Sequence, residues 1–128
     1  MKKYISTMQV EAEPMTMGEA YEKNLLRAGR VPNESEKDKA GYHTKYEDGY
    51  ESWSPAEPFE KAYKVADTPL DRIIIEYDEL KQKIDKLDVF LGSEKFKTLD
   101  EKVKGLLSSQ YHIMIAYSIV LSERMRLM

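Results

Sequence analysis

The 128-residue sequence contains no cysteine and only two histidines, His43 and His112. The lack of cysteine excludes disulfides, a thiolate nucleophile and cysteine-ligated zinc. A metal site would have to rely on carboxylates, and the Asp and Glu residues do not cluster at a spacing that suits one. We therefore expect neither a metal nor a cofactor.

Catalytic motifs and long apolar runs are also missing. The sequence has no nucleophile-elbow serine, no phosphate-binding glycine loop and no zinc-protease motif, so we nominate no catalytic residue and expect a non-enzyme. The longest apolar run, residues 113–121, is interrupted by a serine, and a membrane helix needs about 20 residues. Residues 1–10 are too polar for a signal peptide. We expect a cytoplasmic protein that contacts no membrane.

Basic residues do not predominate in either half of the chain. Lys and Arg number 20 against 23 Asp and Glu, for a formal net charge of −3. Residues 1–67 carry 10 basic and 13 acidic residues, and residues 68–128 carry 10 of each. Duplex nucleic acid is therefore not an expected partner. A small anionic ligand stays open, because a few local donors suffice to bind it.

The pattern of the chain changes near residue 67, and we expect two domains, 1–67 and 68–128. The first predicts a small module of a few strands and short helices. The second predicts a long antiparallel helical hairpin. The predicted fold class is α+β, with the hairpin assembling into a homo-oligomeric helical bundle.

Strand and helix signals alternate at the start of the chain. Residues 4–13 alternate loosely between apolar and polar, which predicts a strand that Pro14 ends. Thr16 and Glu19 fit a capping box, which predicts a short helix through about Arg27.

Two alternating aromatic runs flank Asp48-Gly49, and this pattern predicts a β-hairpin. Ser54 and Pro55 then predict the N-cap and first residue of another helix. The aromatic residues on the hairpin form either a small core or a binding surface; they are Tyr46, Tyr50 and Trp53.

Apolar residues at steps of three and four predict a long helix that begins at Thr68-Pro69 and ends at Gly92, taken as a C′ glycine. The seam consists of Leu70, Ile73, Tyr77, Leu80, Ile84, Leu87 and Leu91. Residues 93–96 form a connector. Thr98 and Glu101 fit a second capping box, which predicts a last helix running nearly to Met128.

The last helix carries two apolar stripes. One contains Leu99, Val103, Leu106, Gln110, Ile113, Tyr117, Val120, Arg124 and Leu127; the other contains Leu107, Met114, Leu121 and Met128. A single antiparallel partner helix can cover only one stripe. The other stripe requires another chain or the N-terminal region, and two helices alone have too little core to be stable. This excess of apolar surface predicts an oligomer.

Five residues are candidates for ligand binding, each with a structural alternative. Tyr77 is either a core residue or a platform on which a purine stacks. Ser93, Lys95 and Lys97 form either a polar loop or a phosphate contact near a helix N-terminus. Arg124, like Gln110, either controls the register of an oligomer or meets a charged ligand at a subunit boundary.

The second region has a distinctive pattern, E-L-x-x-K-I-x-K-L-x-x-F-L-x-S-x-x-F-x-x-L from Glu79 and L-L-x-x-Q-x-x-x-M-x-x-Y-x-x-x-L-x-x-R from Leu106. This pattern, within about 68–128, resembles the anti-CBASS cyclic-nucleotide sponges of bacteriophages. The resemblance implies a compact helical homo-oligomer, typically a hexamer, that binds cyclic dinucleotides between subunits and, in some members, cyclic trinucleotides at separate sites.

Such sponges catalyse nothing; they sequester the second messenger of a bacterial defence system in the host cytoplasm. The resemblance implies that Tyr77 stacks on a base, that Ser93 and Lys95 contact phosphate or a base edge, and that Arg124 serves a trinucleotide site. Residues 1–67 resemble a small module of phage-encoded proteins. The alternative function is an oligomeric interaction module whose N-terminal domain binds a host or phage protein.

Overall fold

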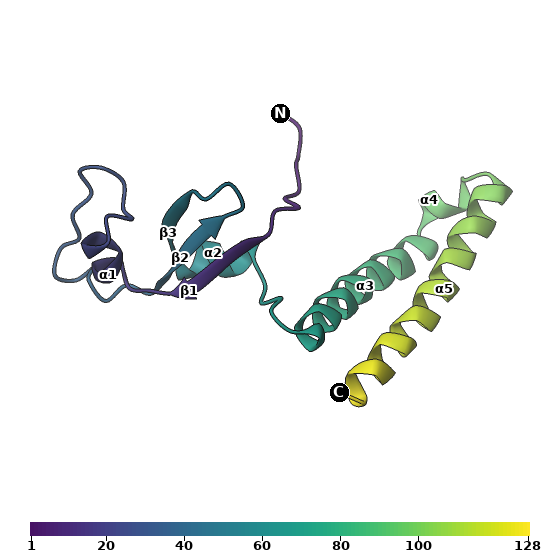
Figure 1. Cartoon of the computed structure of the whole chain (residues 1–128). Coiled ribbons are helices and arrows are strands. Elements are labelled where there is room, and N and C mark those ends of the chain that lie inside the picture. The colour runs from purple at the N-terminus through teal and green to yellow at the C-terminus, as the bar shows by residue number, and fades with distance from the viewer. The chain divides into compact units, whose positions relative to one another are not determined.

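The computed structural model describes residues 1–128. The chain divides into two compact units, Met1–Lys64 and Val65–Met128. The first contains a three-stranded antiparallel sheet and two short helices, and the second contains two long helices (Figure 1). The predicted α+β class is confirmed. None of the helices combines the length and the apolar character that crossing a membrane requires.

The sheet consists of β1 (Val10–Pro14), β2 (Gly41–Tyr46) and β3 (Glu51–Pro55), in the order β1-β2-β3. The β2–β3 hairpin forms at Asp48-Gly49 as predicted, and Gly49 takes the positive φ of 91° that this turn requires.

The first strand is shorter at its start than the sequence predicted. It begins at Val10, not at Tyr4, because Val10 lies opposite Tyr46 and β2 ends there. The strand ends at Pro14 as predicted, with the proline as its last residue. An edge strand accommodates a proline because one side of its backbone needs no ladder hydrogen bond.

Two helix boundaries in the first unit also differ from the prediction. The Thr16 capping box begins α1 (Met17–Glu22) as expected, but the helix ends before Asn24, whose φ of 59° is left-handed. Ser54 caps no helix, because it pairs with Tyr42 in the sheet; α2 (Ala56–Ala62) follows Pro55 without a side-chain cap.

The buried apolar side chains of the first unit are few: Met15, Met17, Ala20 and Pro32. The Trp53 indole Nε1 donates to the Met15 carbonyl at 2.8 Å, which ties β3 to the segment before α1. Trp53 does not join the other hairpin aromatics, since Tyr46 and Tyr50 pair with each other at 5.6 Å. A stack that the sequence analysis missed joins β2 to α2 through Tyr42, Phe59 and Tyr63.

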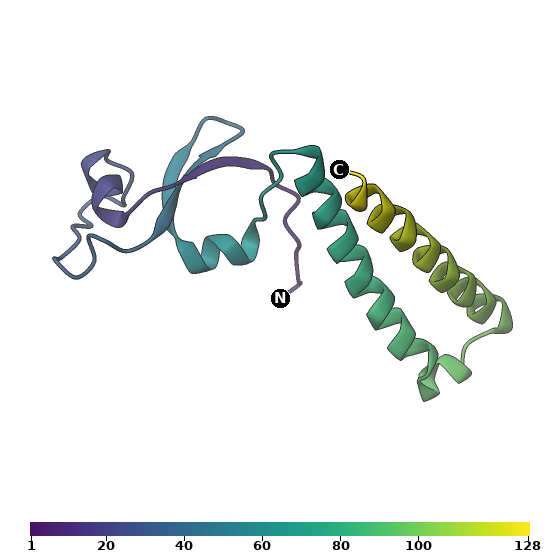
Figure 2. The same ribbon diagram turned by 90° about the horizontal axis from the view of Figure 1, so that it is seen from below.

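The second unit is an antiparallel hairpin of α3 (Pro69–Leu91) and α5 (Glu101–Arg126), which lie side by side in both views (Figures 1 and 2). Thr68 and Asp71 form a capping box that begins α3. The core between the helices is one apolar cluster, made of Ile73, Leu80, Ile84 and Leu121.

The connector contains a helical turn, α4 (Glu94–Lys97), that was not predicted. Gly92 follows α3 with a φ of −90°, so it is not the left-handed glycine that the sequence suggested. Thr98 ends α4 by donating to the Lys95 carbonyl at 2.6 Å, and this contact replaces the predicted capping box. The N-cap of α5 is Asp100, which makes no side-chain cap.

Candidate ligand-binding site

The two apolar stripes of α5 have different environments in the hairpin. The stripe that includes Leu107, Met114 and Leu121 faces α3, together with Tyr111, Ser118 and Met125. Leu121 is fully buried in this contact. The hairpin therefore covers one stripe and leaves the other uncovered within the chain.

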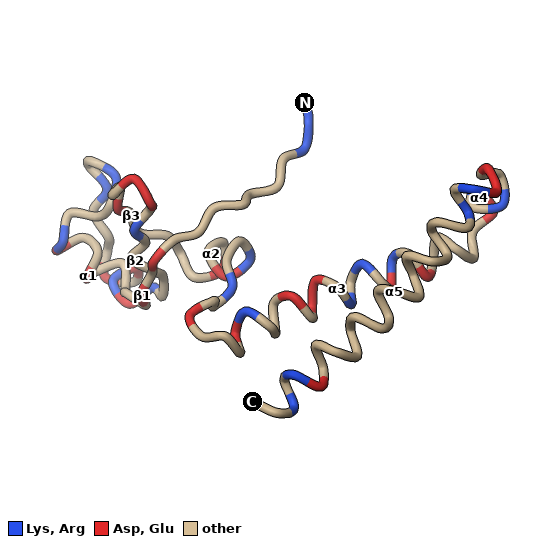
Figure 3. Tube along the Cα trace, turned by 45° about the vertical axis from the view of Figure 1, so that its right-hand side comes forward, with Lys and Arg blue, Asp and Glu red and all other residues tan.

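We call the uncovered stripe the α5 outer face; it consists of Val103, Leu106, Gln110, Ile113, Tyr117, Val120, Arg124 and Leu127. Leu106, Ile113 and Val120 are 64%, 68% and 55% exposed. Residues 105–122 contain no Lys, Arg, Asp or Glu, which the uncharged stretch of α5 in Figure 3 makes visible. Apolar side chains thus line a stripe of α5 that α3 does not cover.

Arg124 lies near the C-terminal end of the α5 outer face and is exposed. The neighbouring Glu123 pairs with Arg126 at 2.8 Å, so this carboxylate is engaged elsewhere. The Arg124 guanidinium is thus a free cation beside apolar surface, a position in which an anion or a carboxylate of another molecule would be bound in bidentate fashion.

Tyr77 lies in α3, half-buried, and packs against the core cluster of the hairpin. Its ring therefore contributes to the core, which was the structural alternative for this residue. Because burial is partial, some of the ring surface stays accessible. The preceding residue, Glu76, accepts a hydrogen bond from the Tyr117 hydroxyl of the α5 outer face, a link between the two helices that the sequence pattern did not reveal.

Ser93 and the two lysines lie at the connector end of the hairpin. The Ser93 hydroxyl donates to the Phe90 carbonyl at 2.6 Å and accepts from the Phe96 amide at 3.2 Å, so it is the N-cap of α4. Lys97 pairs with Glu94 at 3.1 Å, and Lys95 is exposed. Of the three, the Lys95 ammonium is the group most available to an added anion.

The predicted site residues form two groups within one chain. Ser93, Lys95 and Lys97 share the connector end, whereas Tyr77 lies 16 residues before Ser93, about 24 Å along the axis of α3. Arg124 lies near the end of α5, toward the beginning of α3. No single chain brings the five residues together, so a site that uses both groups would need more than one copy.

The ionisable groups offer no metal centre: no cluster of three or more Asp, Glu or His side chains is arranged to hold an ion. In the sheet, His43 lies between Glu13 and Glu51, with nitrogen–oxygen distances of 3.2 and 2.7 Å. Hydrogen bonds to Glu13 and then to Glu51 raise the pKa of His43 above its ordinary value. In the hairpin, burial and then the Asp88 carboxylate raise the pKa of Tyr111.

The second unit is thus defined by its structure as a helical hairpin with one uncovered apolar face. Residues 67–127, which are 61 of the 128 residues, match the family model described as Sequestin. The match agrees, at the level of the family, with the resemblance to the anti-CBASS sponges, and it leaves out the sheet unit. No curated protein matches the chain, and no solved structure does.

Proposed function

We propose that the chain captures a cyclic di- or trinucleotide between copies of its helical hairpin and holds it without chemical change. The observation that carries this proposal is the match of residues 67–127 to Sequestin, a name that implies sequestration. The α5 outer face supports it, because copies that associate through this face create crevices at their boundaries. We expect a homo-oligomer, with a hexamer as the favoured size.

Each candidate residue has a role that follows from its chemistry. A base stacks on the accessible part of the Tyr77 ring, since an aromatic face accepts any base. Lys95 and Lys97 neutralise phosphate, and Arg124 contacts the trinucleotide at a separate boundary. Ser93 holds α4 in place as its N-cap, so its contribution is to position Lys95 and Lys97.

The biological role we propose is evasion of bacterial immunity by a phage-encoded protein in the host cytoplasm. A sponge lowers the free concentration of the messenger by mass action, so it must bind at least as tightly as the host effector and be made in excess. A pocket that is already formed by the oligomer gives such affinity, because binding then costs little conformational entropy.

Titration calorimetry of the full chain with 3′,3′-cyclic GMP-AMP and with cyclic tri-adenylate tests this function directly. We expect tight binding of at least one of them. Denaturing the complex and analysing the ligand by mass spectrometry should return it unmodified. If no cyclic di- or trinucleotide in a broad panel gives a heat of binding, the proposed function is wrong.

Substitutions at Tyr77 separate stacking from packing. Tyr77→Leu keeps an apolar side chain in the core but removes the aromatic face, and we expect about tenfold or greater loss of dinucleotide affinity, as stacking is worth about 1–3 kcal/mol per base. Tyr77→Phe keeps the face and should bind as the wild type does. Equal affinity of the two variants would assign Tyr77 to the core alone.

Substitution of the free cations tests the phosphate contacts. Lys95→Gln should weaken dinucleotide binding and reduce its dependence on salt, because one phosphate contact is lost. Lys86→Gln is the matched control, an exposed lysine within α3. Arg124→Gln should weaken trinucleotide binding and leave dinucleotide binding unchanged. Losses at Lys86 as large as those at Lys95 would indicate a general charge effect.

The second candidate function is an oligomeric interaction module whose sheet unit binds a host or phage protein. It is favoured by the half-exposed stack of Tyr42, Phe59 and Tyr63, with ring centroids 4.3 and 4.8 Å apart. Under this function a Phe59→Ala variant loses a protein partner in pull-down assays. Under the sponge function the same variant keeps its affinity for nucleotide.

A further inference from the structure

The segment before β1 has the composition of a strand but no strand beside it. Residues 3–9 contain aromatic and β-branched side chains and neither proline nor glycine, a composition typical of strands. Tyr4, Ile5 and Met8 are 88%, 93% and 53% exposed. An extended segment with exposed apolar side chains and open backbone groups is a template for pairing with another strand.

The chain's own sheet cannot supply that strand. Val10 lies opposite Tyr46, and β2 then enters the turn, in which the Gly49 amide donates to the Tyr46 carbonyl at 2.9 Å. The Tyr46 amide donates in turn to the Tyr50 carbonyl at 2.8 Å. β1 is moreover an edge of the sheet, with β2 as its only neighbour. Residues 3–9 lie outside the sheet and have no strand partner within the chain; the Met8 amide donates to the Ser6 hydroxyl at 3.2 Å. We call residues 3–9 and the outer side of β1 together the open edge.

We propose that this edge is a docking surface for the same edge of a second copy of the chain. The two edges pair antiparallel about a two-fold axis perpendicular to the sheet, so that residues 3–11 of one copy lie beside residues 3–11 of the other. Such isologous pairing satisfies both open edges at once, because each copy presents the surface that it binds.

Charge and side-chain size select one register. Two-fold symmetry requires residues of the same face to lie opposite each other, so only alternate registers are allowed. With Thr7 opposite Thr7, Lys3 lies opposite Glu11 and Tyr4 lies opposite Val10. Each copy thus contributes one lysine–glutamate pair and one aromatic–β-branched pair, both of which are favourable across strands.

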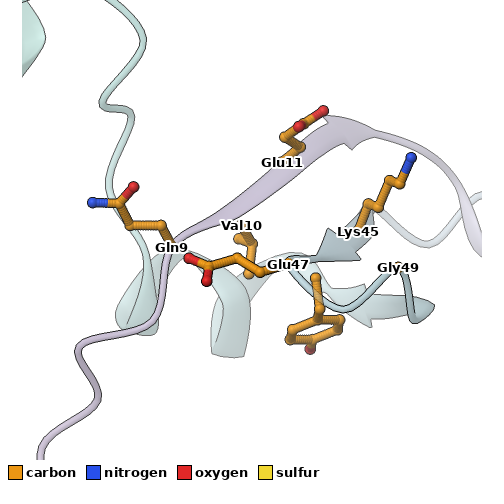
Figure 4. Close-up of a pocket in the computed structure, with 7 residues that line it drawn as sticks. Gln9, Val10, Glu11, Lys45, Glu47 and Gly49 are labelled. Atoms are coloured by element: carbon orange, nitrogen blue, oxygen red, sulfur yellow. The ribbon is translucent and has the colours of Figure 1, made fainter.

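An open hollow of about 260 Å³ lies beside the residues that this register pairs. It is lined by Gln9, Val10, Glu11, Lys45, Tyr46, Glu47 and Gly49, which come from the segment before β1, from β1 and β2, and from the turn (Figure 4). In the proposed register the second copy's residues 3–5 run alongside Glu11, Val10 and Gln9. The apolar wall offered by Val10 and Tyr46 suits the ring of the incoming Tyr4.

The absence of native cysteine makes cross-linking a clean test. In the full-length chain, Thr7→Cys places two thiols opposite each other, and cross-strand neighbours lie at about 4.5–5.5 Å between Cα atoms, which a disulfide spans. Ile5→Cys is the matched control: its counterpart is Gln9, so the two thiols lie about 13 Å apart along the strands. Under mild oxidation we expect Thr7→Cys to form covalent dimers about tenfold faster than Ile5→Cys.

Charge reversal provides a second test, which is read out by the same Thr7→Cys cross-linking reaction. Lys3→Glu in the Thr7→Cys background should slow cross-linking about fivefold, and adding Glu11→Lys should restore it. Equal rates for Thr7→Cys and Ile5→Cys would overturn the interface, whether the segment is unpaired or binds a different partner. Fastest cross-linking at another position, or no rescue by the double charge reversal, would overturn the register.

Discussion

The two units of the chain are held together in different ways. The sheet unit has few buried apolar side chains and depends on backbone ladders, the Trp53–Met15 hydrogen bond and stacked aromatics. The hairpin unit depends on a single apolar seam between α3 and α5. Exposed apolar residues line one stripe of α5, and others lie on α3 at Leu70, Ile74 and Val89. The difference teaches that packing α3 against α5 leaves apolar side chains of α5 uncovered within one chain.

The unfolding of the two units can be followed by two different spectroscopic signals. Trp53 is the only tryptophan and lies in the sheet unit, so its fluorescence follows that unit. The two helices of 23 and 26 residues dominate far-UV circular dichroism and follow the hairpin. Leu121→Ala, Gly41→Ala and His43→Gln are each designed to change one of these two signals and not the other.

The largest expected effect comes from Leu121→Ala. Leu121 is fully buried in the cluster with Ile73, Leu80 and Ile84, and truncating such a leucine costs about 2–5 kcal/mol. Urea unfolding should show an early loss of the helical signal while the Trp53 transition stays in place. Leu106→Ala on the α5 outer face is the control and should leave the unfolding of an isolated protomer nearly unchanged. If both signals of Leu121→Ala shift together, the two units do not unfold independently.

Ile113→Glu should dissociate the assembly without unfolding the hairpin. The side chain is 68% exposed on the α5 outer face, so a protomer loses no packing, but an interface would lose about 1.5–3 kcal/mol of burial per copy. Native mass spectrometry over a concentration series should show protomers where the wild type is oligomeric. His112→Glu adds the same charge at the next residue, on a different part of the helix surface, and should assemble normally. A wild type that stays monomeric would contradict assembly of copies through the α5 outer face.

Gly41→Ala is the counterpart of Leu121→Ala in the sheet unit. An added Cβ would lie 2.3 Å from Trp53 Cζ2 and 2.4 Å from the Ser54 carbonyl oxygen. Such overpacking costs about 1–3 kcal/mol, so the fluorescence transition should come earlier and the helical transition should not. Gly105→Ala in α5 is the matched control, because its Cβ would meet no atom within 4 Å; it should stabilise the hairpin by about 0.8–1 kcal/mol. A stable Gly41→Ala sheet would mean that Trp53 can move away.

Helical periodicity and capping residues were enough to predict the elements that are determined by residues close together in the chain. The Thr16 capping box, the turn at Asp48-Gly49 and the long helix after Thr68 all formed where the sequence placed them. The two stripes of α5 likewise predicted that one would lack a partner helix. Each of these features is set by residues close together in the chain.

The errors arose where a distant contact outweighed a local signal. Ser54 carries a helix-cap pattern, but pairing with Tyr42 keeps it in the sheet. The strand signal of residues 4–9 is real, but β2 stops at Tyr46, so no ladder forms there within the chain. Thr98 serves the unpredicted α4 instead of α5. The candidate site stays a prediction for the same reason: Tyr77 and Ser93 lie far apart in one hairpin, and only neighbouring copies would bring such groups together.

The smallest expected effect is a dependence of the sheet unit on pH through His43. Its imidazole bridges Glu13 on β1 and Glu51 on β3, and these hydrogen bonds raise its pKa above the ordinary 6.5. A raised pKa in the folded state means that the stabilisation is complete below about pH 6.5 and is lost as the pH rises through the folded value.

The urea midpoint of the Trp53 transition should therefore fall between about pH 6 and pH 9 in the wild type. The His43→Gln variant should show a flatter profile, since glutamine carries no charge to lose. The helical transition is the internal reference, because the hairpin contains no histidine paired with a carboxylate; His112 Nδ1 lies 2.8 Å from the Ser108 carbonyl oxygen. Identical slopes for the two proteins would show that the bridge across the three strands adds nothing to the sheet, and that backbone pairing and the aromatic contacts suffice to hold it.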